Sequence, residues 1–118
     1  ISESPSIFFK DLEGLIAPIS IAHGEGRADY PELTQKTKFC MQYVNNHGRV
    51  TQKYPANPNG STEGVAGVTS DDGRVTLMMP HPERVFLNQQ LSWESALNRP
   101  TESVWMEIFH NAKQWVQN

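Results

Sequence analysis

The chain contains one cysteine in 118 residues, and this scarcity excludes two kinds of site. A lone Cys40 has no partner for an intramolecular disulfide, and a zinc site built on cysteines needs more than one of them. Basic residues are also few, since ten lysines and arginines stand against 13 aspartates and glutamates and form no block. A surface for nucleic acid is therefore not expected.

Long apolar runs are missing as well, so no membrane partner is expected: a membrane-spanning helix needs about 20 such residues. The first ten residues, ISESPSIFFK, lack the basic end and apolar stretch of a secretory signal. The composition predicts a soluble, cytoplasmic chain of one domain. Because the chain begins with Ile1 rather than Met, and an apolar run follows almost at once, we expect residues 1–118 to be part of a longer protein.

Apolar runs alternate with turn signals along the chain and predict an α/β domain. We expect strands over residues 6–9, 15–22, 39–44, 50–54, 64–69 and 74–79. The sequence Asp72-Gly73 between two apolar runs is a strong hairpin signal, and residues 45–48 predict a second turn. The segment PANPNGS, residues 55–61, is expected to be a loop, because its prolines, asparagines and glycine do not suit a helix or a central strand.

Three helices are expected. Asp29 can cap a short helix over residues 29–36, and Pro82 suits the first turn of another that runs toward Leu87. The clearest helix covers residues 101–116, with Thr101 as its cap. Its apolar residues recur at helical spacing and predict a face that docks on a sheet. They are Val104, Trp105, Ile108, Phe109, Ala112, Trp115 and Val116.

The candidate site is the sequence Met-Met-Pro-His-Pro-Glu-Arg at residues 78–84. An apolar strand leads to His81, at the carboxyl end where open α/β sheets place ligands. Pro82 keeps His81 extended, and Glu83 is near enough to orient the imidazole. A histidine held by a carboxylate is the base half of a nucleophile–base–acid triad. The alternative is a plain strand end in which Glu83 serves the start of the next helix.

Four segments together resemble a known family. They are AHGEGR at residues 22–27, YVNNHG at 43–48, the stretch from PANPNGS through GVAGVTSDDGRVTLMMPHPERVF at 55–86, and WMEIFHNAKQW at 105–115. In this order they resemble the C-terminal part of a class I glutamine amidotransferase domain. Within that class they are similar to phosphoribosylformylglycinamidine synthase (formylglycinamide ribonucleotide amidotransferase), in its long, single-chain form, and the tail fits the free-standing glutaminase subunit less well.

The resemblance implies a Cys–His–Glu triad on a flavodoxin-like sheet, with His81 as the catalytic base and Glu83 as its orienting acid. The cysteine of such domains attacks the amide carbon of glutamine, a γ-glutamyl thioester forms, and ammonia passes to an ATP-dependent synthetase site in purine biosynthesis. The expected partners are glutamine and the synthetase domain of the same parent chain. ATP and magnesium are expected in that synthetase domain, and no cofactor or metal is expected in this segment.

The chain departs from the family pattern at the nucleophile. Cys40 lies between Phe39 and Met41 on an expected strand and has no neighbouring glycine, so it is expected to be a small buried hydrophobe. The family's cysteine would then precede Ile1, and the 118-residue chain alone is expected to be inactive. A non-catalytic docking module derived from such a domain is the alternative.

The loop after residue 22 permits two interpretations. His23, Glu25 and Arg27 would share one face if the segment were extended, and its glycines permit a close approach to a ligand. The loop would then line the glutamine pocket or a domain contact, while an exposed polar turn is the alternative. The loop at residues 55–61 is expected near the active site or as a rigid connector.

Overall fold

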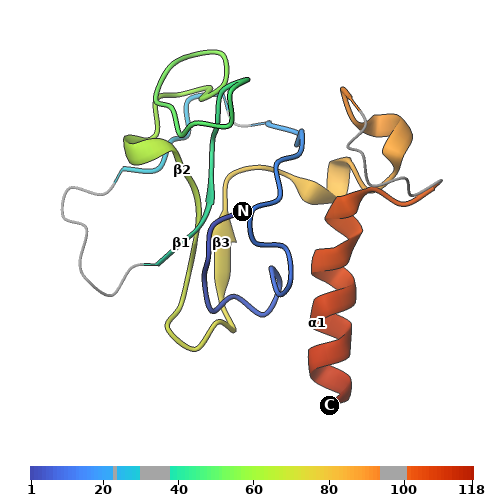
Figure 1. Cartoon of the computed structure of the whole chain (residues 1–118). Coiled ribbons are helices and arrows are strands. Elements are labelled where there is room, and N and C mark those ends of the chain that lie inside the picture. The colour runs from blue at the N-terminus through green and yellow to red at the C-terminus, as the bar shows by residue number, and fades with distance from the viewer. Residues whose placement is uncertain (23, 30–37, 94–100) are drawn as a thin grey trace.

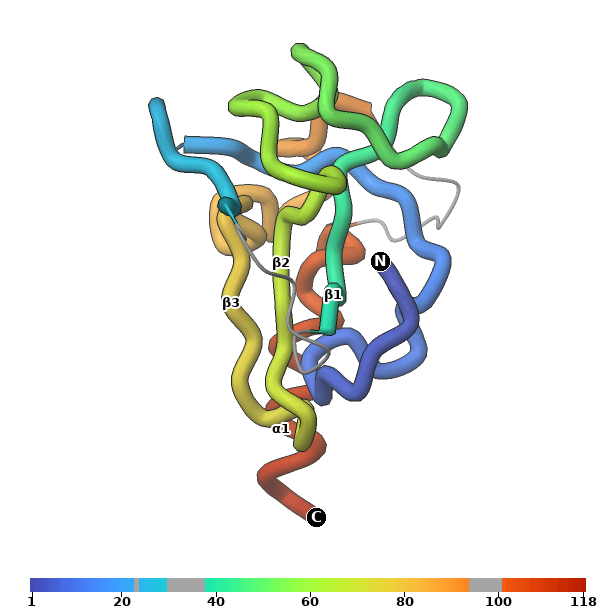
Figure 2. Tube along the Cα trace, turned by 90° about the vertical axis from the view of Figure 1, so that its left-hand side faces the viewer, coloured from blue at the N-terminus to red at the C-terminus, as the bar shows by residue number. Residues whose placement is uncertain are grey.

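The computed structural model describes residues 1–22, 24–29, 38–93 and 101–118. Within these ranges the chain forms a three-stranded antiparallel sheet in the order β1–β2–β3. The strands are β1 (Lys38–Gln42), β2 (Val65–Thr69) and β3 (Thr76–Met78), and the one α-helix among the described residues is α1 (Glu107–Gln117). The sheet lies in front of α1 in Figure 2, with the N-terminal segment at its side. The expected α/β class is confirmed, with antiparallel strands.

The sheet is organised around β2, whose VAGVT sequence is almost wholly buried. Val68 is paired with Phe39 of β1 on one side and with Leu77 of β3 on the other. The hairpin predicted between β2 and β3 is confirmed. Gly73 has φ +72° there, and a Cβ at this position would lie 1.9 Å from the carbonyl oxygen of Pro5. Glycine is therefore required both by the turn and by the N-terminal segment that crosses it.

The N-terminal segment lies beside both the sheet and α1 (Figures 1 and 2) but forms neither predicted strand. The strand expected at residues 6–9 is a turn, in which the Phe9 N–H donates to the Ser6 carbonyl. Asn111 of α1 donates to the carbonyls of Phe8 and Lys10, so a helix side chain takes acceptors that a strand would need. Phe9 itself is buried in the core, which explains the apolar run.

The strand expected at residues 15–22 is also wrong, although the segment packs beside the core. Pro18 has no N–H to donate to a neighbouring strand. Its carbonyl oxygen accepts a hydrogen bond of 2.7 Å from the indole N–H of Trp105. The Trp105 hydrogen bond and packing against the core thus take the place of the strand-to-strand hydrogen bonds that the β-rich composition predicted.

The second predicted hairpin forms its turn but lacks the second strand. The Asn45 N–H donates to the Arg49 carbonyl, and a single bridge joins Val44 to Val50, after which residues 51–54 leave the sheet. The predicted loop at residues 55–61 is confirmed, and it is built around Asn57, whose side chain is fully buried. The Asn57 amide donates to the carbonyls of Thr51 and Ser61 and accepts from the Ser61 N–H, each at 3.0 Å.

The predicted C-terminal helix is present but begins later than expected. A 3-10 turn, η4 (Val104–Met106), leads into α1, and its cap is Ser103 instead of Thr101, since the Ser103 side chain accepts from the Trp105 N–H. Val104, Trp105 and Ile108 are buried. The later part of the apolar stripe is not covered by the sheet, because Phe109, Trp115 and Val116 are 44%, 50% and 75% exposed.

Two shorter helix predictions have different outcomes. The helix expected from Pro82 to Leu87 is a single 3-10 turn, η2 (Pro82–Arg84), which ends at Val85. The helix expected at residues 29–36 lies outside the described residues except for Asp29. Two other 3-10 turns are η1 (Thr62–Gly64) and η3 (Asn88–Gln90).

Cys40 lies at the centre of the core with no exposed surface, as expected for a small buried hydrophobe. Burial raises the pKa of its thiol to about 12. Its neighbours in the core come from the N-terminal segment, the sheet and the C-terminal elements. They include Phe9, Met41, Tyr43, Ala66, Val85, Val104, Trp105 and Ile108. A thiol in this position is protonated at neutral pH and cannot act as a nucleophile.

We expect Cys40 to resist alkylation while the chain is folded. Because the thiolate is the reactive species, a pKa of about 12 slows the reaction with iodoacetamide at pH 8 roughly a thousandfold relative to a free thiol. Mass spectrometry follows the labelling, and the same chain in guanidinium chloride is the control. Equal labelling rates in the folded and unfolded chain would contradict this placement.

Asn57→Ala is expected to lower the free energy of unfolding by about 3 kcal/mol, because it leaves buried backbone groups without partners. Asn46→Ala, at an exposed position in the turn after β1, is the matched control and should change it by less than about 0.5 kcal/mol. Urea unfolding followed by circular dichroism measures both values. Equal, small effects would mean that the loop does not depend on Asn57.

Candidate active site

The main chain around His81 is held by short-range and long-range hydrogen bonds. β3 ends at Met78, and the Met79 N–H donates to the Ala66 carbonyl of β2. The N–H of His81 donates to the Ser20 carbonyl at 2.8 Å, and its carbonyl accepts from the Arg84 N–H at 3.1 Å. Pro82 occupies the first position of η2, where its missing N–H is not needed. His81 is therefore fixed between the end of the sheet and a tight turn.

The side chains of His81 and Glu83 meet directly. The imidazole Nδ1 lies 2.7 Å from Glu83 Oε1. The hydrogen bond to His81 is the largest cause that lowers the pKa of the Glu83 carboxyl, which favours the ionised acid. An ionised carboxylate can only accept, so Nδ1 carries the proton of this bond and Nε2 is the nitrogen available to a substrate. The histidine side chain is 35% exposed, so a reacting group can reach it.

This contact bears on the alternative of a plain strand end. The His81 side chain makes no capping hydrogen bond to η2, and the Glu83 carboxylate turns back to the imidazole instead of serving only the start of that turn. The geometry required of a base and its orienting acid is therefore present at these two residues. Their catalytic role stays a prediction.

An open pocket of about 350 Å³ lies beside the pair. Most of its lining is apolar and comes from β3, the N-terminal segment and α1, with His81 and Glu83 as its ionisable groups. Its volume lies at the lower end of the usual range for small-molecule sites. A larger pocket, of about 890 Å³, lies between the N-terminal segment and the end of α1 and includes neither His81 nor Glu83. The larger volume therefore does not mark the pocket that contains the His81–Glu83 pair.

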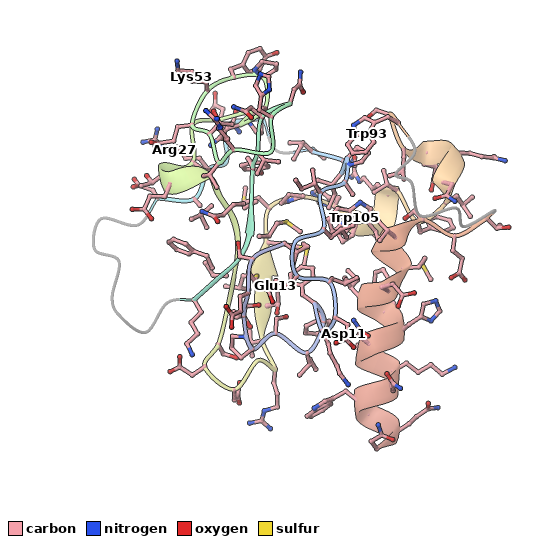
Figure 3. All side chains as sticks on the ribbon, viewed as in Figure 1. Asp11, Glu13, Arg27, Lys53, Trp93 and Trp105 are labelled. Atoms are coloured by element: carbon pink, nitrogen blue, oxygen red, sulfur yellow. The ribbon has the colours of Figure 1, made fainter. Side chains whose placement is uncertain are left out.

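The loop with the sequence AHGEGR does not reach this pocket through its charged side chains. Glu25 and Arg27 are exposed and do not line it, and Figure 3 shows Arg27 well away from Trp105. His23 lies outside the described residues. The loop is instead joined to the loop at residues 55–61: Asn59 Nδ2 donates to the Gly26 carbonyl at 2.6 Å, and the Ala28 N–H donates to Ser61 Oγ at 3.1 Å. Glu25 and Arg27 therefore do not line the pocket beside His81, and a contact of this loop with another domain stays a prediction.

Sequence reasoning missed the residues that hold the His81 backbone. Ser20 supplies the acceptor for the His81 N–H, and Trp105 and Ser103 bond to the chain on either side of the site. A tryptophan in an apolar stripe was a usable signal, because a buried indole N–H nearly always finds an acceptor. The apolar stripe could not show which carbonyl accepts the indole N–H, because that carbonyl belongs to Pro18, 87 residues away along the chain.

The described residues offer neither a metal cluster nor a membrane-spanning helix. Within residues 1–22, 24–29, 38–93 and 101–118, no three histidine, cysteine, aspartate or glutamate side chains lie together as a metal site would require. In the same part of the chain, no helix has the length and apolar character needed to span a bilayer.

The Glu83 carboxyl should titrate below the ordinary glutamate range, and His81→Gln should move its pKa back upward. A carboxyl with a lowered folded-state pKa contributes stability above its unfolded pKa of about 4.3 and loses that contribution as the pH falls through the folded value. Carbon-13 NMR of the side-chain carboxyls measures the titration. Asp72 is the internal control, since Ser70 and Arg74 hold its pKa at about 2 independently of His81. An unchanged Glu83 pKa in His81→Gln would refute the contact.

Comparison with protein families identifies the class of domain to which the chain belongs. The family model of the CobB/CobQ-like glutamine amidotransferase domain matches residues 1–116, which is nearly the entire chain. The match includes both residues of the His81–Glu83 pair and the C-terminal segment that packs behind them. The chain belongs to the CobB/CobQ-like glutamine amidotransferase domain family.

Proposed function

We propose that this chain supplies the base and the orienting acid of a glutaminase site in phosphoribosylformylglycinamidine synthase. The observation that carries the proposal is the 2.7 Å contact between His81 Nδ1 and Glu83 Oε1. The order of the four resembling segments is what points to this particular synthase among the glutamine amidotransferases. In this proposal ammonia is released from glutamine and converts formylglycinamide ribonucleotide to the amidine at a synthetase site that uses ATP and magnesium.

The proposed chemistry assigns a proton to each step. His81 Nε2 takes the proton of the cysteine thiol, and the resulting thiolate attacks the side-chain amide carbon of glutamine. The C–N bond then breaks as Nε2 gives that proton to the departing ammonia. A γ-glutamyl thioester remains. His81 Nε2 then takes a proton from water, whose oxygen attacks the thioester carbon. The C–S bond breaks, Nε2 gives the proton to the leaving sulfur, glutamate is released and the thiol is regenerated. Glu83 holds the imidazole tautomer and stabilises the charged ring throughout.

The nucleophile of this scheme is not Cys40. Its thiol is buried and its pKa is about 12, so it is neither reachable by glutamine nor ionised. The proposal therefore requires a cysteine from outside residues 1–118, and the synthetase site that uses ATP also lies outside them.

A non-catalytic docking module is the second candidate, and the inaccessible Cys40 is the observation that favours it. The 118-residue chain alone is expected to show no glutamine hydrolysis in either case. The two candidates differ in the full-length protein, where only the first makes His81 necessary.

In that full-length protein, His81→Ala should lower kcat for glutamine-dependent amidine formation by about 10²–10⁴-fold, because proton transfer to ammonia is lost. Activity with added ammonium salts should largely survive, since the synthetase site is elsewhere. Glu83→Gln should also reduce the glutamine reaction selectively, by about 10–100-fold. A coupled ADP-release assay with each nitrogen source measures these effects.

His47→Ala is the matched control, because His47 is exposed in the turn after β1 and is expected to leave both reactions unchanged. Equal loss of the glutamine and ammonium reactions in His81→Ala would argue against the proposed role. Full glutamine-dependent activity in that variant would favour the docking module.

A further inference from the structure

The C-terminal segment bonds both to the chain that follows His81 and to the N-terminal segment that accepts the His81 N–H. η4 packs against η2, the turn that begins directly after His81. Two fully or almost fully buried residues of the segment, Ser103 and Trp105, are 0% and 3% exposed. The Trp105 indole donates to the Pro18 carbonyl in the N-terminal segment, and the Ser103 hydroxyl donates to the Val85 carbonyl after η2.

Trp105 bonds to the N-terminal segment, which contacts the main chain of His81. Its indole N–H donates to the Pro18 carbonyl at 2.7 Å, and two residues later the Ser20 carbonyl accepts the His81 N–H at 2.8 Å. Pro18 has no N–H of its own, so this part of the segment cannot be held by a regular strand ladder. Figure 3 shows Trp105 at the start of the C-terminal helix, close to the N-terminal trace. The indole hydrogen bond therefore holds Pro18, two residues before the Ser20 carbonyl that accepts the His81 N–H.

Ser103 bonds to the chain that follows His81, at Val85 and Phe86. Its hydroxyl donates to the Val85 carbonyl in a short hydrogen bond, and its N–H donates to the Phe86 carbonyl at 2.7 Å. Val85 closes η2, because its N–H donates to the Pro82 carbonyl. The same serine hydroxyl accepts from the Trp105 N–H, so both contacts come from one hydrogen-bonded turn.

We propose that Trp105 and Ser103 are positioning residues for His81, which they hold at the distance and angle that its contact with Glu83 requires. This inference rests on the proposed glutaminase role of His81 for its functional meaning. Its structural content is independent: removing the indole N–H should loosen the hydrogen bond between His81 and Ser20 while the sheet remains intact. A tryptophan that served only as an apolar filler would be replaced by phenylalanine without this effect, since both rings are apolar and the indole N–H is the group that is lost.

The test is nitrogen-15 NMR of the 118-residue chain with Trp105→Phe. We expect hydrogen exchange of the His81 amide to rise about tenfold or more, which is the effect of losing one buried hydrogen bond on a local opening. The Nδ1 and Nε2 signals of His81 should also shift. The amides of β2 and the ring signals of His110, on α1, should keep their wild-type values. Trp115→Phe, at a half-exposed position on the same helix, is the matched control and should alter none of these signals.

Ser103→Ala tests the other contact and should disturb the His81 ring and the Val85 and Phe86 region without changing β2. If Trp105→Phe does not fold, 3-benzothienylalanine at position 105 keeps the two-ring shape and replaces the N–H by sulfur, so it permits the same comparison. Wild-type exchange and ring signals of His81 in a folded variant would overturn the proposal. An equal rise in exchange across β2 and His81 would also overturn it, because Trp105 would then support overall stability alone.

These measurements contain no glutamine, so their outcome is separate from that of the His81→Ala activity assay. If the glutaminase role holds, Trp105→Phe in the full-length protein should lower kcat for glutamine about tenfold and leave KM and the ammonium reaction nearly unchanged.

Discussion

The hydrogen bond between His81 Nδ1 and Glu83 Oε1 is the interaction on which the functional interpretation depends. Both side chains are partly exposed, at 35% and 57%. An exposed pair of this kind contributes little to the free energy of folding, because water competes for both groups. Its importance is therefore geometric: the carboxylate selects the imidazole tautomer and directs Nε2 outward. Such an orientation persists only if the main chain beneath the pair does not move.

Three segments that are distant in sequence meet at the site and bond to its main chain. β3 brings His81 to the end of the sheet, the N-terminal segment accepts its N–H at Ser20, and the C-terminal segment holds the turn that follows. The buried cluster that includes Phe9, Cys40 and Trp105 lies between these segments. The apolar core thus does more than stabilise the fold, since it fixes the relative positions of the elements that carry the site. Cys40 belongs to this core and not to the chemistry.

Local signals predicted the parts of the structure whose hydrogen bonds are also local. The Asp72-Gly73 hairpin, the loop at residues 55–61 and the helical pattern after Trp105 were recovered because turn residues and periodicity specify them. The failures were at residues 6–9, 15–22 and 50–54. At residues 6–9 and 15–22 a β-rich composition was correct about packing but wrong about pairing, because Asn111 and Trp105 bond to carbonyls that a strand would use. At residues 50–54 the competing donor is close in sequence, since Asn57 bonds to the Thr51 carbonyl. For the two N-terminal segments, no sequence pattern shows which side chain will bond to these carbonyls, because the donors lie 103 and 87 residues away along the chain.

The sequence by itself determined that His81 and Glu83 can meet: the histidine lies between two prolines and the glutamate is two residues later, so the spacing is short and the backbone is restricted. It also determined that the single cysteine has apolar neighbours. The tertiary structure alone decided that Cys40 is buried in the core, that Glu25 and Arg27 do not line the pocket, and that Ser20 accepts the His81 N–H. It also decided that Ser103 bonds to Val85 and Trp105 to Pro18. The physical reason is that these outcomes depend on which distant backbone acceptors are satisfied by which buried donors, and only the folded chain brings them together.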